Sequence, residues 1–205
     1  MSGLLLVGGG GHCRSCIDVI EADARYTIRG VVDRQPAAVA DLLGYPLLGD
    51  DAMLASLLEL ERNALVTVGQ IKSAEARIRL YSLLKSIDAV LPTIVSPHAY
   101  VSKHAGLGEG TILFHGAIVN ARAFIARNCI VNSRALVEHD AVVGDHSHIS
   151  TGAIINGSCH IGNGTFVGSG AVVHNGVKIG SGCVIAAGAV VKNDVPDGTL
   201  MRGDQ

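Results

Sequence analysis

From Val95 to Val191 a branched apolar residue recurs at every sixth position of the chain, seventeen times without interruption. The fifth position of each hexad is small, most often Ala, Cys, Ser or Thr, and the second is often Gly, Ser or Asn. A period of six is typical of a hexapeptide parallel β-helix, in which each hexad forms one short strand and one turn. The pattern therefore predicts an all-β solenoid over this half of the chain.

Three hexads should close a triangular coil of eighteen residues, with the branched side chain pointing inward and the small residue at the corner. Residues eighteen apart are then expected to stack on one another along the helix axis. Glycine and asparagine tolerate the turn dihedrals at the corners. A thin prism has no room for rings, which agrees with an aromatic content of 3% and no Trp.

Residues 1–91 lack this period and read instead as strands alternating with helices. An unbroken apolar run, Leu4–Val7, is typical of a parallel strand that is buried on both faces. The further elements expected are a helix over 13–22, a strand over 28–33, a short helix over 51–60, a strand over 64–69 and a helix over 73–87. We place Ala74, Ile78, Tyr81 and Leu84 on the buried face of the last helix.

Alternating strands and helices indicate a small parallel, Rossmann-like α/β sheet. We expect the α/β domain to occupy residues 1–91 and the β-helix residues 92–205, with the junction at Leu91-Pro92.

Four glycines, Gly8 to Gly11, follow the first strand and precede His12. Such a turn lets the backbone of a helix N-terminus approach a phosphate, and Asp33 ends the second strand, where these folds bind a ribose hydroxyl. The bland alternative is a turn that needs positive φ. We favour binding of a mononucleotide or nucleotide sugar over NAD, because Cys13 takes the third glycine position of the dinucleotide fingerprint.

Charge and composition remove several classes of function. The net charge of −2 and the absence of a basic cluster argue against nucleic acid and membrane surfaces as partners. No apolar run is long enough for membrane insertion, and the first residues do not resemble a signal peptide, so a cytoplasmic location is expected. The five cysteines have no framework spacing, and we interpret Cys13, Cys16, Cys129, Cys159 and Cys183 as packing residues.

Eight of the nine histidines lie in the repeat region, which raises the alternative of a zinc hydratase on the same type of prism. No two of them are 18 or 36 residues apart, so none should stack, and we expect no metal site within the chain. His139 differs from the others because Glu138 and Asp140 flank it. A carboxylate can orient an imidazole that acts as a general base, and the stacked neighbours Ala121, Gly157 and Asn175 would leave space for a ligand. A solvated, inert Glu-His-Asp turn is the alternative.

The chain resembles the left-handed β-helix sugar acetyltransferases, a family of sialic acid O-acetyltransferases and bacillosamine or perosamine N-acetyltransferases. The motifs that carry the resemblance are Gly9-Gly-Gly-His12, Gly44-Tyr-Pro-Leu-Leu-Gly49, Val131-Asn-Ser133, Val137-Glu-His-Asp140 and His146-Ser-His-Ile149. The resemblance covers nearly the whole chain.

This resemblance implies an acetyl-CoA-dependent homotrimer that needs no metal and has its active sites between subunits. It makes His139 the general base, oriented by Asp140. His148, Gly157 and Ala187 would bind the cofactor, with His148 at the acetyl thioester. Gly9, Gly10, Gly11, His12, Asp33 and Asn132 would bind the sugar substrate.

The expected reaction is N-acetylation of a nucleotide-linked 4-amino-4,6-dideoxy sugar. O-acetylation of a sialic acid is the alternative, and a non-enzymatic trimeric partner of sugar-biosynthesis enzymes is a more distant one. The family usually continues with Gly-x-Pro-Ala after the Val195-Pro-Asp-Gly198 turn. Here Thr199 to Gln205 lack Pro-Ala, so contacts at the adenine end of the cofactor are expected to differ.

Overall fold

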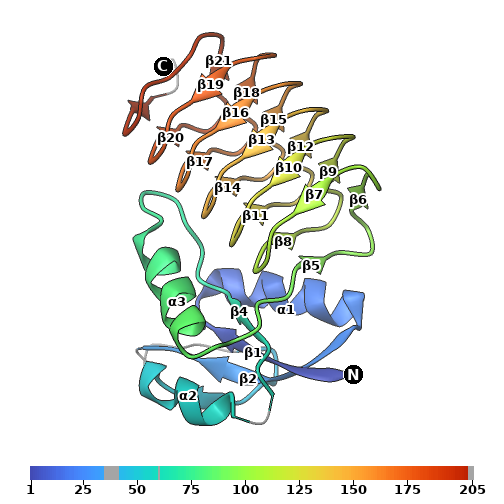
Figure 1. Cartoon of the computed structure of the whole chain (residues 1–205), viewed down its shortest axis with the longest axis vertical. Helices are drawn as coiled ribbons and strands as arrows, with labels where there is room; N and C mark the ends of the chain where they lie inside the picture. Colours follow the sequence, from blue (N-terminus) through green and yellow to red (C-terminus); the bar gives the residue numbers. More distant parts are fainter. Residues whose placement is uncertain (35–41, 60, 203–205) are drawn as a thin grey trace.

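The computed structural model describes residues 1–34, 42–59 and 61–202. A small α/β unit, formed by the first part of the chain, lies at one end of a long β-helix (Figure 1). Within the described residues, no helix has both the length and the apolar content needed to span a bilayer.

The α/β unit is built on a parallel sheet of order β3-β2-β1-β4. This order places the topological switch between β1 and β4, where open α/β sheets bind ligands beyond the carboxyl ends of their strands. Its elements are β1 Ser2–Val7, α1 Gly11–Asp23, β2 Tyr26–Val32, β3 Leu47–Gly49, the 3-10 helix η2 Asp51–Met53, α2 Leu54–Leu57, β4 Ala64–Val66 and α3 Glu75–Ser86. The Rossmann-like prediction is confirmed.

Two details of the prediction for this unit are wrong. The segment 51–60 forms a 3-10 turn and a single helical turn, and its last residue lies outside the described residues. On α3 the expected core residue Ile78 is 39% exposed, whereas Arg77 beside it is completely buried. Hydrophobicity alone points Ile78 inward, but Arg77 finds carbonyl acceptors at the end of β4 and two oxygens of Asn128 in the β-helix, which no local pattern reveals.

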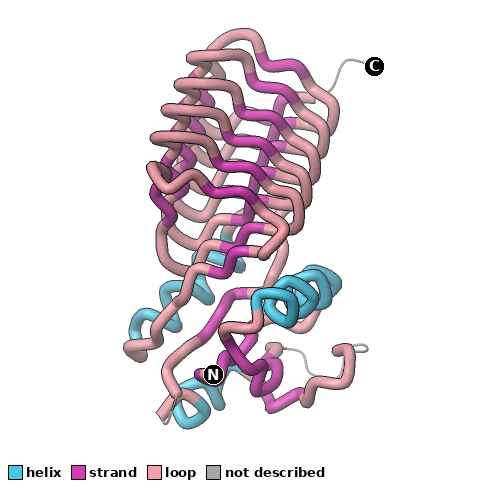
Figure 2. Tube along the Cα trace, turned by 90° about the vertical axis from the view of Figure 1, so that its right-hand side faces the viewer, coloured by secondary structure: helices cyan, strands magenta, loops and turns pink. Residues whose placement is uncertain are grey.

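The β-helix consists of two-residue strands that form three parallel sheets along its three sides (Figure 2). One sheet holds β5 Ile94–Val95, β8 Ile112–Leu113, β11 Ile130–Val131, β14 His148–Ile149, β17 Phe166–Val167, β20 Val184–Ile185 and β22 Leu200–Met201. The second holds β6 Tyr100–Val101, β9 Ile118–Val119, β12 Leu136–Val137, β15 Ile154–Ile155, β18 Val172–Val173 and β21 Val190–Val191. The third holds β7 Gly106–Leu107, β10 Phe124–Ile125, β13 Val142–Val143, β16 His160–Ile161 and β19 Lys178–Ile179.

The predicted coil of eighteen residues is confirmed by the register, since Phe124 pairs with Val142 and Val142 with His160. The last coil is two residues shorter, because Val184 pairs with Leu200. Residues 203–205, the end of the stretch that lacks the Pro-Ala of the family, lie outside the described residues.

The interior of the β-helix is a single column of branched and small side chains from successive coils. All three phenylalanines lie outside this column. Phe114 packs towards the α/β unit, Phe124 is exposed, and Phe166 faces out of the seven-stranded sheet. The small fifth-position residues Cys129, Cys159 and Cys183 are fully buried, as expected for packing residues.

The α/β unit docks on the seven-stranded sheet through an apolar contact and a polar clamp. Helix α1 places Ile17 and Ile20 in one cluster with Ile112 and Ile130 of the β-helix. Cys13 and Cys16 belong to this same buried cluster, as their interpretation as packing residues requires.

The polar clamp is the guanidinium of Arg77. Its Nη1 donates to the carbonyls of Val66 and Val68 at 3.1 and 2.6 Å, and its Nη2 donates to the carbonyl and Oδ1 of Asn128 at 3.0 and 2.6 Å. Burial lowers the pKa of Arg77 to about 10, so the side chain remains charged at neutral pH. One cation therefore ties the end of β4 to a corner of the β-helix.

We predict that Arg77→Met lowers the free energy of unfolding by about 2–4 kcal/mol, because it leaves several buried carbonyl groups without a donor. Thermal and urea unfolding measure the change. The matched control is Arg79→Met on the same helix, whose guanidinium is partly exposed and pairs with Asp51. An equal loss of stability in both variants would contradict the clamp.

Candidate functional site

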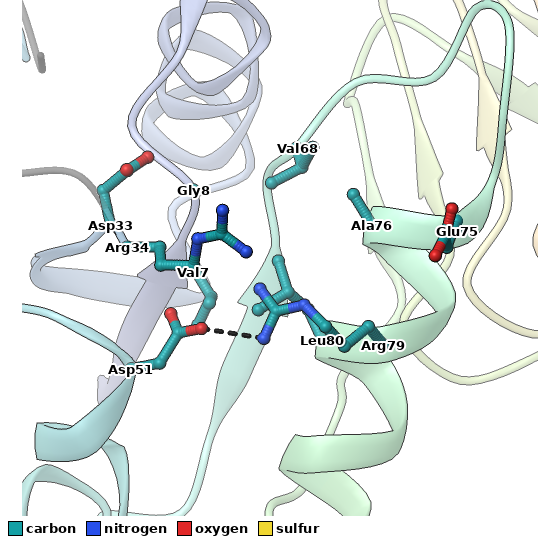
Figure 3. Close-up of a pocket in the computed structure, with 10 residues that line it drawn as sticks. All are labelled: Val7, Gly8, Asp33, Arg34, Asp51, Val68, Glu75, Ala76, Arg79 and Leu80. Carbon is teal, nitrogen blue, oxygen red and sulfur yellow. Dashed lines mark hydrogen bonds and ion pairs between the residues drawn. The ribbon is translucent and has the colours of Figure 1, made fainter.

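A cavity of about 420 Å³ opens at the carboxyl edge of the α/β sheet. Figure 3 shows Asp33 and Arg34 on one side, α3 with Glu75, Ala76 and Arg79 on the other, and the hydrogen bond that joins Arg79 to Asp51. The distance from Arg79 Nη1 to Asp51 Oδ2 is 2.9 Å. This cavity lies at the switch point of the sheet, where the fold favours a ligand.

The glycine turn borders this cavity. Its glycines differ in whether the fold requires the absence of a side chain. Gly8 has φ 111°, and a Cβ there would lie 2.3 Å from Val68 Cγ2, so the turn itself requires glycine. Gly10 has φ −75° and no atom within 4 Å of an added Cβ, and the nearest atom to a Cβ on Gly11 is 3.7 Å away. Positive φ therefore accounts for Gly8 but not for Gly10, whose missing side chain leaves open space at the N-terminus of α1.

Asp33 supports the turn directly, because the Gly9 N–H donates to its Oδ2 at 2.7 Å. The carboxylate thus lies beside the glycine turn at the end of β2, as expected. His12 turns the other way, towards the β-helix. Its ring centroid is 5.3 Å from that of Phe114 and 6.4 Å from that of His148, and burial lowers its pKa to about 3.

His148 and Asn132 continue this line of polar groups on the seven-stranded sheet. His148 Nδ1 is 2.7 Å from the carbonyl oxygen of Gln70, and its Nε2 is 3.2 Å from Asn132 Nδ2. His148 is 5% exposed, and burial lowers its pKa to about 4. The structure therefore brings Asn132, His148, His12 and the glycine turn into one region.

His139 lies elsewhere, on the corner that joins β12 to β13, and is exposed. Its Nδ1 is 2.9 Å from Asp140 Oδ2, and the other oxygen of Asp140 accepts from Arg122 Nε at 2.8 Å. The hydrogen bond with His139, helped by the charge of Arg122, holds the pKa of Asp140 below its usual value. Asp140 is thus positioned to fix the ring with Nδ1 protonated, which leaves Nε2 free to accept a proton.

Glu138, the other flanking carboxylate, makes different contacts. Its Oε2 accepts from Asn120 Nδ2 at 2.9 Å and from the backbone N–H of His139 at 3.3 Å. It therefore holds the backbone of the turn, whereas Asp140 holds the imidazole.

Gly157 lies directly against the ring of His139, one coil further along. A Cβ on Gly157 would lie 2.7 Å from His139 Cε1 and 2.8 Å from its Nε2. The predicted stacking of these positions is therefore correct. Ala187 is an exposed residue of another corner, after β20, and its backbone nitrogen would lie 2.5 Å from a Cβ on Gly168.

The predicted site residues thus form two groups that the single chain does not join. His139, Asp140 and Gly157 lie on the corner between the five- and six-stranded sheets. Asn132 and His148 belong to the seven-stranded sheet and the turn that follows it, on the side where the α/β unit packs (Figure 1).

Among the described parts of the chain, no group of three or more His, Cys, Asp and Glu side chains is arranged to hold a metal ion.

Sequence reasoning missed three residues that hold the predicted site residues or the junction beside them: Gln70 at His148, Arg77 at Asn128 and Arg122 at Asp140. Gln70 is buried and follows β4, and its side-chain amide donates to the Gly164 carbonyl at 3.0 Å. Arg122 is eighteen residues before Asp140, so the stacking rule could have found it. Gln70 and Arg77 contact residues far away in the sequence, and no local signal identifies them.

Two family models match the chain. The PglD N-terminal domain matches residues 3–82, and the bacterial transferase hexapeptide (six repeats) matches residues 158–193. No curated protein is significantly similar to the chain.

Several solved structures are similar over nearly the whole chain. PerB from Caulobacter crescentus, solved with CoA and GDP-perosamine, is 33% identical with a TM-score of 0.89, over 96% of this chain and 92% of that one. A histidine-to-asparagine variant of the perosamine N-acetyltransferase from the same organism is 31% identical with a TM-score of 0.90, over 96% and 91%. The acetyltransferase domain of PglB from Neisseria gonorrhoeae is 29% identical with a TM-score of 0.88, over 97% and 95%.

We predict that stability falls as the pH drops from about 6.5 towards 4, because His12 and His148 take up protons in the unfolded chain while burial keeps them neutral in the folded chain. Their pKa values in the folded chain lie below the ordinary value of 6.5, so the unfolded chain binds more protons in this window. Each histidine should contribute on the order of 2 kcal/mol to the loss.

Urea unfolding at several pH values measures this dependence. His148→Gln should flatten the curve relative to the wild-type chain, whereas the exposed His160→Gln should leave it unchanged. Parallel curves for the wild-type chain and His148→Gln would show that His148 does not titrate on unfolding.

Proposed function

The chain belongs to the family of left-handed β-helix sugar acetyltransferases with a PglD-type N-terminal domain, and from this we propose that it transfers an acetyl group from acetyl-CoA to a sugar. The observation that carries the proposal is the His139–Asp140 pair on an open corner, with the bare backbone of Gly157 against the imidazole. This arrangement offers a base next to a surface that a ligand can reach.

In the proposed reaction His139 Nε2 takes a proton from the sugar amine or hydroxyl as that group attacks the thioester carbon. The carbonyl electrons move to oxygen, and collapse of this tetrahedral oxyanion breaks the C–S bond and releases the CoA thiolate. Asp140 supports the imidazolium that forms. A positioned base contributes about 10²–10⁴-fold to such a rate, and no metal takes part.

We propose that the acceptor is a nucleotide-linked 4-amino-4,6-dideoxy sugar that binds in the α/β unit. The open backbone at Gly10 and Gly11 offers N–H groups at the N-terminus of α1, the kind of site that binds phosphate. Gly9 and His12 complete this turn, and Asp33 lies beside it. The similar PerB structure, which contains GDP-perosamine, supports a nucleotide sugar.

We assign substrate binding and catalysis to different parts of the chain. Residues 1–91 would form the substrate-binding domain and residues 92–205 the catalytic domain. Asn132 is assigned to the acceptor, and Gly157 and Ala187 to the cofactor. His148 is assigned to the acetyl thioester of the cofactor, as the family resemblance implies.

We further propose a homotrimer in which each site combines the two groups of residues from neighbouring copies. The outward positions of the six-stranded sheet support this assembly, because all are apolar: Tyr100, Ile118, Leu136, Ile154, Val172 and Val190. The five-stranded sheet instead presents His160 and Lys178 among its outward residues. A continuous apolar face on one side of a β-helix is suited to packing against another copy.

To test the reaction, thiol release from acetyl-CoA should be measured with UDP-, GDP- and dTDP-linked 4-amino sugars and with free and CMP-linked sialic acid. We expect release with one amino sugar and a loss of about 10²–10⁴-fold in kcat for His139→Asn. His160→Asn, an exposed histidine of the five-stranded sheet, is the matched control. Release with a sialic acid alone would move the assignment to O-acetylation, and a trimer that binds no CoA would favour a non-enzymatic partner.

To test the assembly, Leu136→Asp should convert the trimer into monomers, because it buries a charge in the apolar face. Light scattering coupled to size exclusion gives the mass directly. His160→Asp changes the equivalent strand position of the polar sheet and should leave the trimer intact. A wild-type monomer would contradict the proposed shared site.

A further inference from the structure

Three side chains from two successive coils lie in a line at the corner of the proposed base. His139 Nδ1 is 2.9 Å from Asp140 Oδ2, and Arg122 Nε is 2.8 Å from Asp140 Oδ1. Each oxygen of the carboxylate therefore has its own partner. The register of eighteen residues brings Arg122 to this place from the preceding coil, so the line runs from a cation through a carboxylate to an imidazole.

Both partners of the ion pair occupy left-handed corners of the β-helix. The φ angle is 63° at Arg122 and 60° at Asp140, and glycine holds most of the other left-handed positions among the described corners. An L-residue adopts this conformation at a cost in free energy that glycine avoids. The two positions are stacked in successive coils, and their side chains meet. Backbone strain that a fold retains in this way is characteristic of functional sites.

The imidazole of His139 has more negative than positive neighbours. The residues that surround it in its own turn and in the adjacent coils are Glu138, Asp140, Arg122, Asn120, Gly157 and Asn175. Two of them are carboxylates and one is a cation, while the following coil brings only an uncharged glycine and asparagine. A further cation of this corner, Lys103, is two coils away from the ring.

A histidine that acts as a general base must be neutral before it takes the substrate proton. A neighbouring carboxylate favours the imidazolium instead, because the two opposite charges attract each other. The carboxylate can also rotate away from the ring unless its second oxygen has a partner. The guanidinium of Arg122 meets both needs, since it lies against that second oxygen and carries the opposite charge.

We propose that Arg122 is a positioning residue for the base. Its guanidinium fixes the Asp140 carboxylate against His139 Nδ1, and its charge offsets that of the carboxylate, so that His139 is neutral when the acceptor binds. This inference rests on the proposed acetyl transfer with His139 as the base. Arg122 acts through Asp140 and needs no contact with either substrate.

The first test is a double-mutant cycle on kcat for acetyl transfer. Arg122→Met should lower kcat about 5-fold at pH 7, the size expected for the loss of one exposed ion pair. In the His139→Asn background the same substitution should leave the residual rate unchanged, because a positioning residue acts only through the base. Arg127→Met is the matched control. Arg127 pairs with Asp145 of the next coil at another corner, with Nε 3.1 Å from Oδ1, and its loss should leave kcat unchanged.

The second test follows the charge of the imidazole. Arg122→Met should move the acid limb of the kcat profile to higher pH by about half a unit, because loss of a nearby cation favours the imidazolium. Arg122→Lys restores a cation and should return the limb to the wild-type pH. In ¹⁵N-histidine-labelled protein without substrate, the titration midpoint of His139, assigned with His139→Asn, should move in the same direction in Arg122→Met.

Three results would overturn the role of Arg122. They are a loss of kcat that persists in the His139→Asn background, an unmoved His139 titration in Arg122→Met, and a loss of equal size in Arg127→Met. Failure of the wild-type chain to acetylate any acceptor, or a wild-type rate in His139→Asn, would instead contradict the proposed function or its base. The titration would still decide whether Arg122 controls the charge of His139.

Discussion

The packing inside the β-helix is the constraint on which the rest of this structure depends. The interior of each coil is so narrow that it accepts one branched residue and one small residue per side, and the backbone hydrogen bonds of the strands run between neighbouring coils. The register is therefore eighteen residues from β5 to β21, and only the last coil is shorter. This register carries Gly157 to His139 and Arg122 to Asp140, so the geometry of the proposed base follows from the same packing that stabilises the fold.

The same rigidity explains why the proposed chemistry divides between two sides of the molecule. A coil without inserted loops cannot bend the corner of His139 towards the sheet that carries His148. The α/β unit covers that sheet and supplies the glycine turn and the cavity beside it. In the proposed trimer the corner of His139 from one copy lies beside the His148 sheet of a neighbouring copy. The apolar outer face of the six-stranded sheet is the surface that would hold the copies together.

At the junction of the two parts, the buried side chains Arg77, His12 and His148 carry a single charge at neutral pH, that of Arg77. Arg77 is paired with carbonyl and amide oxygens, and the two nearby histidines, His12 and His148, are held neutral by burial. A protonated histidine here would meet the charge of Arg77 in a medium that screens it poorly. The hydrogen bonds from the Gln70 carbonyl through the neutral ring of His148 to Asn132 can therefore form at neutral pH. Protonation of the ring in acid is expected to break the bond to Asn132.

The repeat, the coil length, the α/β pattern and the stacking of Gly157 on His139 were all determined by the sequence itself, because each depends on short-range periodicity. The glycine turn and Asp33 could also be found there, since they occupy set places after strands of such folds. The tertiary structure alone decided that Arg77 is buried while Ile78 is exposed, that Asp140 rather than Glu138 holds His139, and that His148 lies behind Asn132. The contacts of Arg77 and His148 join residues up to 78 positions apart in the chain, as for Gln70 and His148, and are fixed only when the two parts dock. The contact of Asp140 with His139 is instead set inside the β-helix, where Arg122 of the preceding coil holds the other carboxylate oxygen.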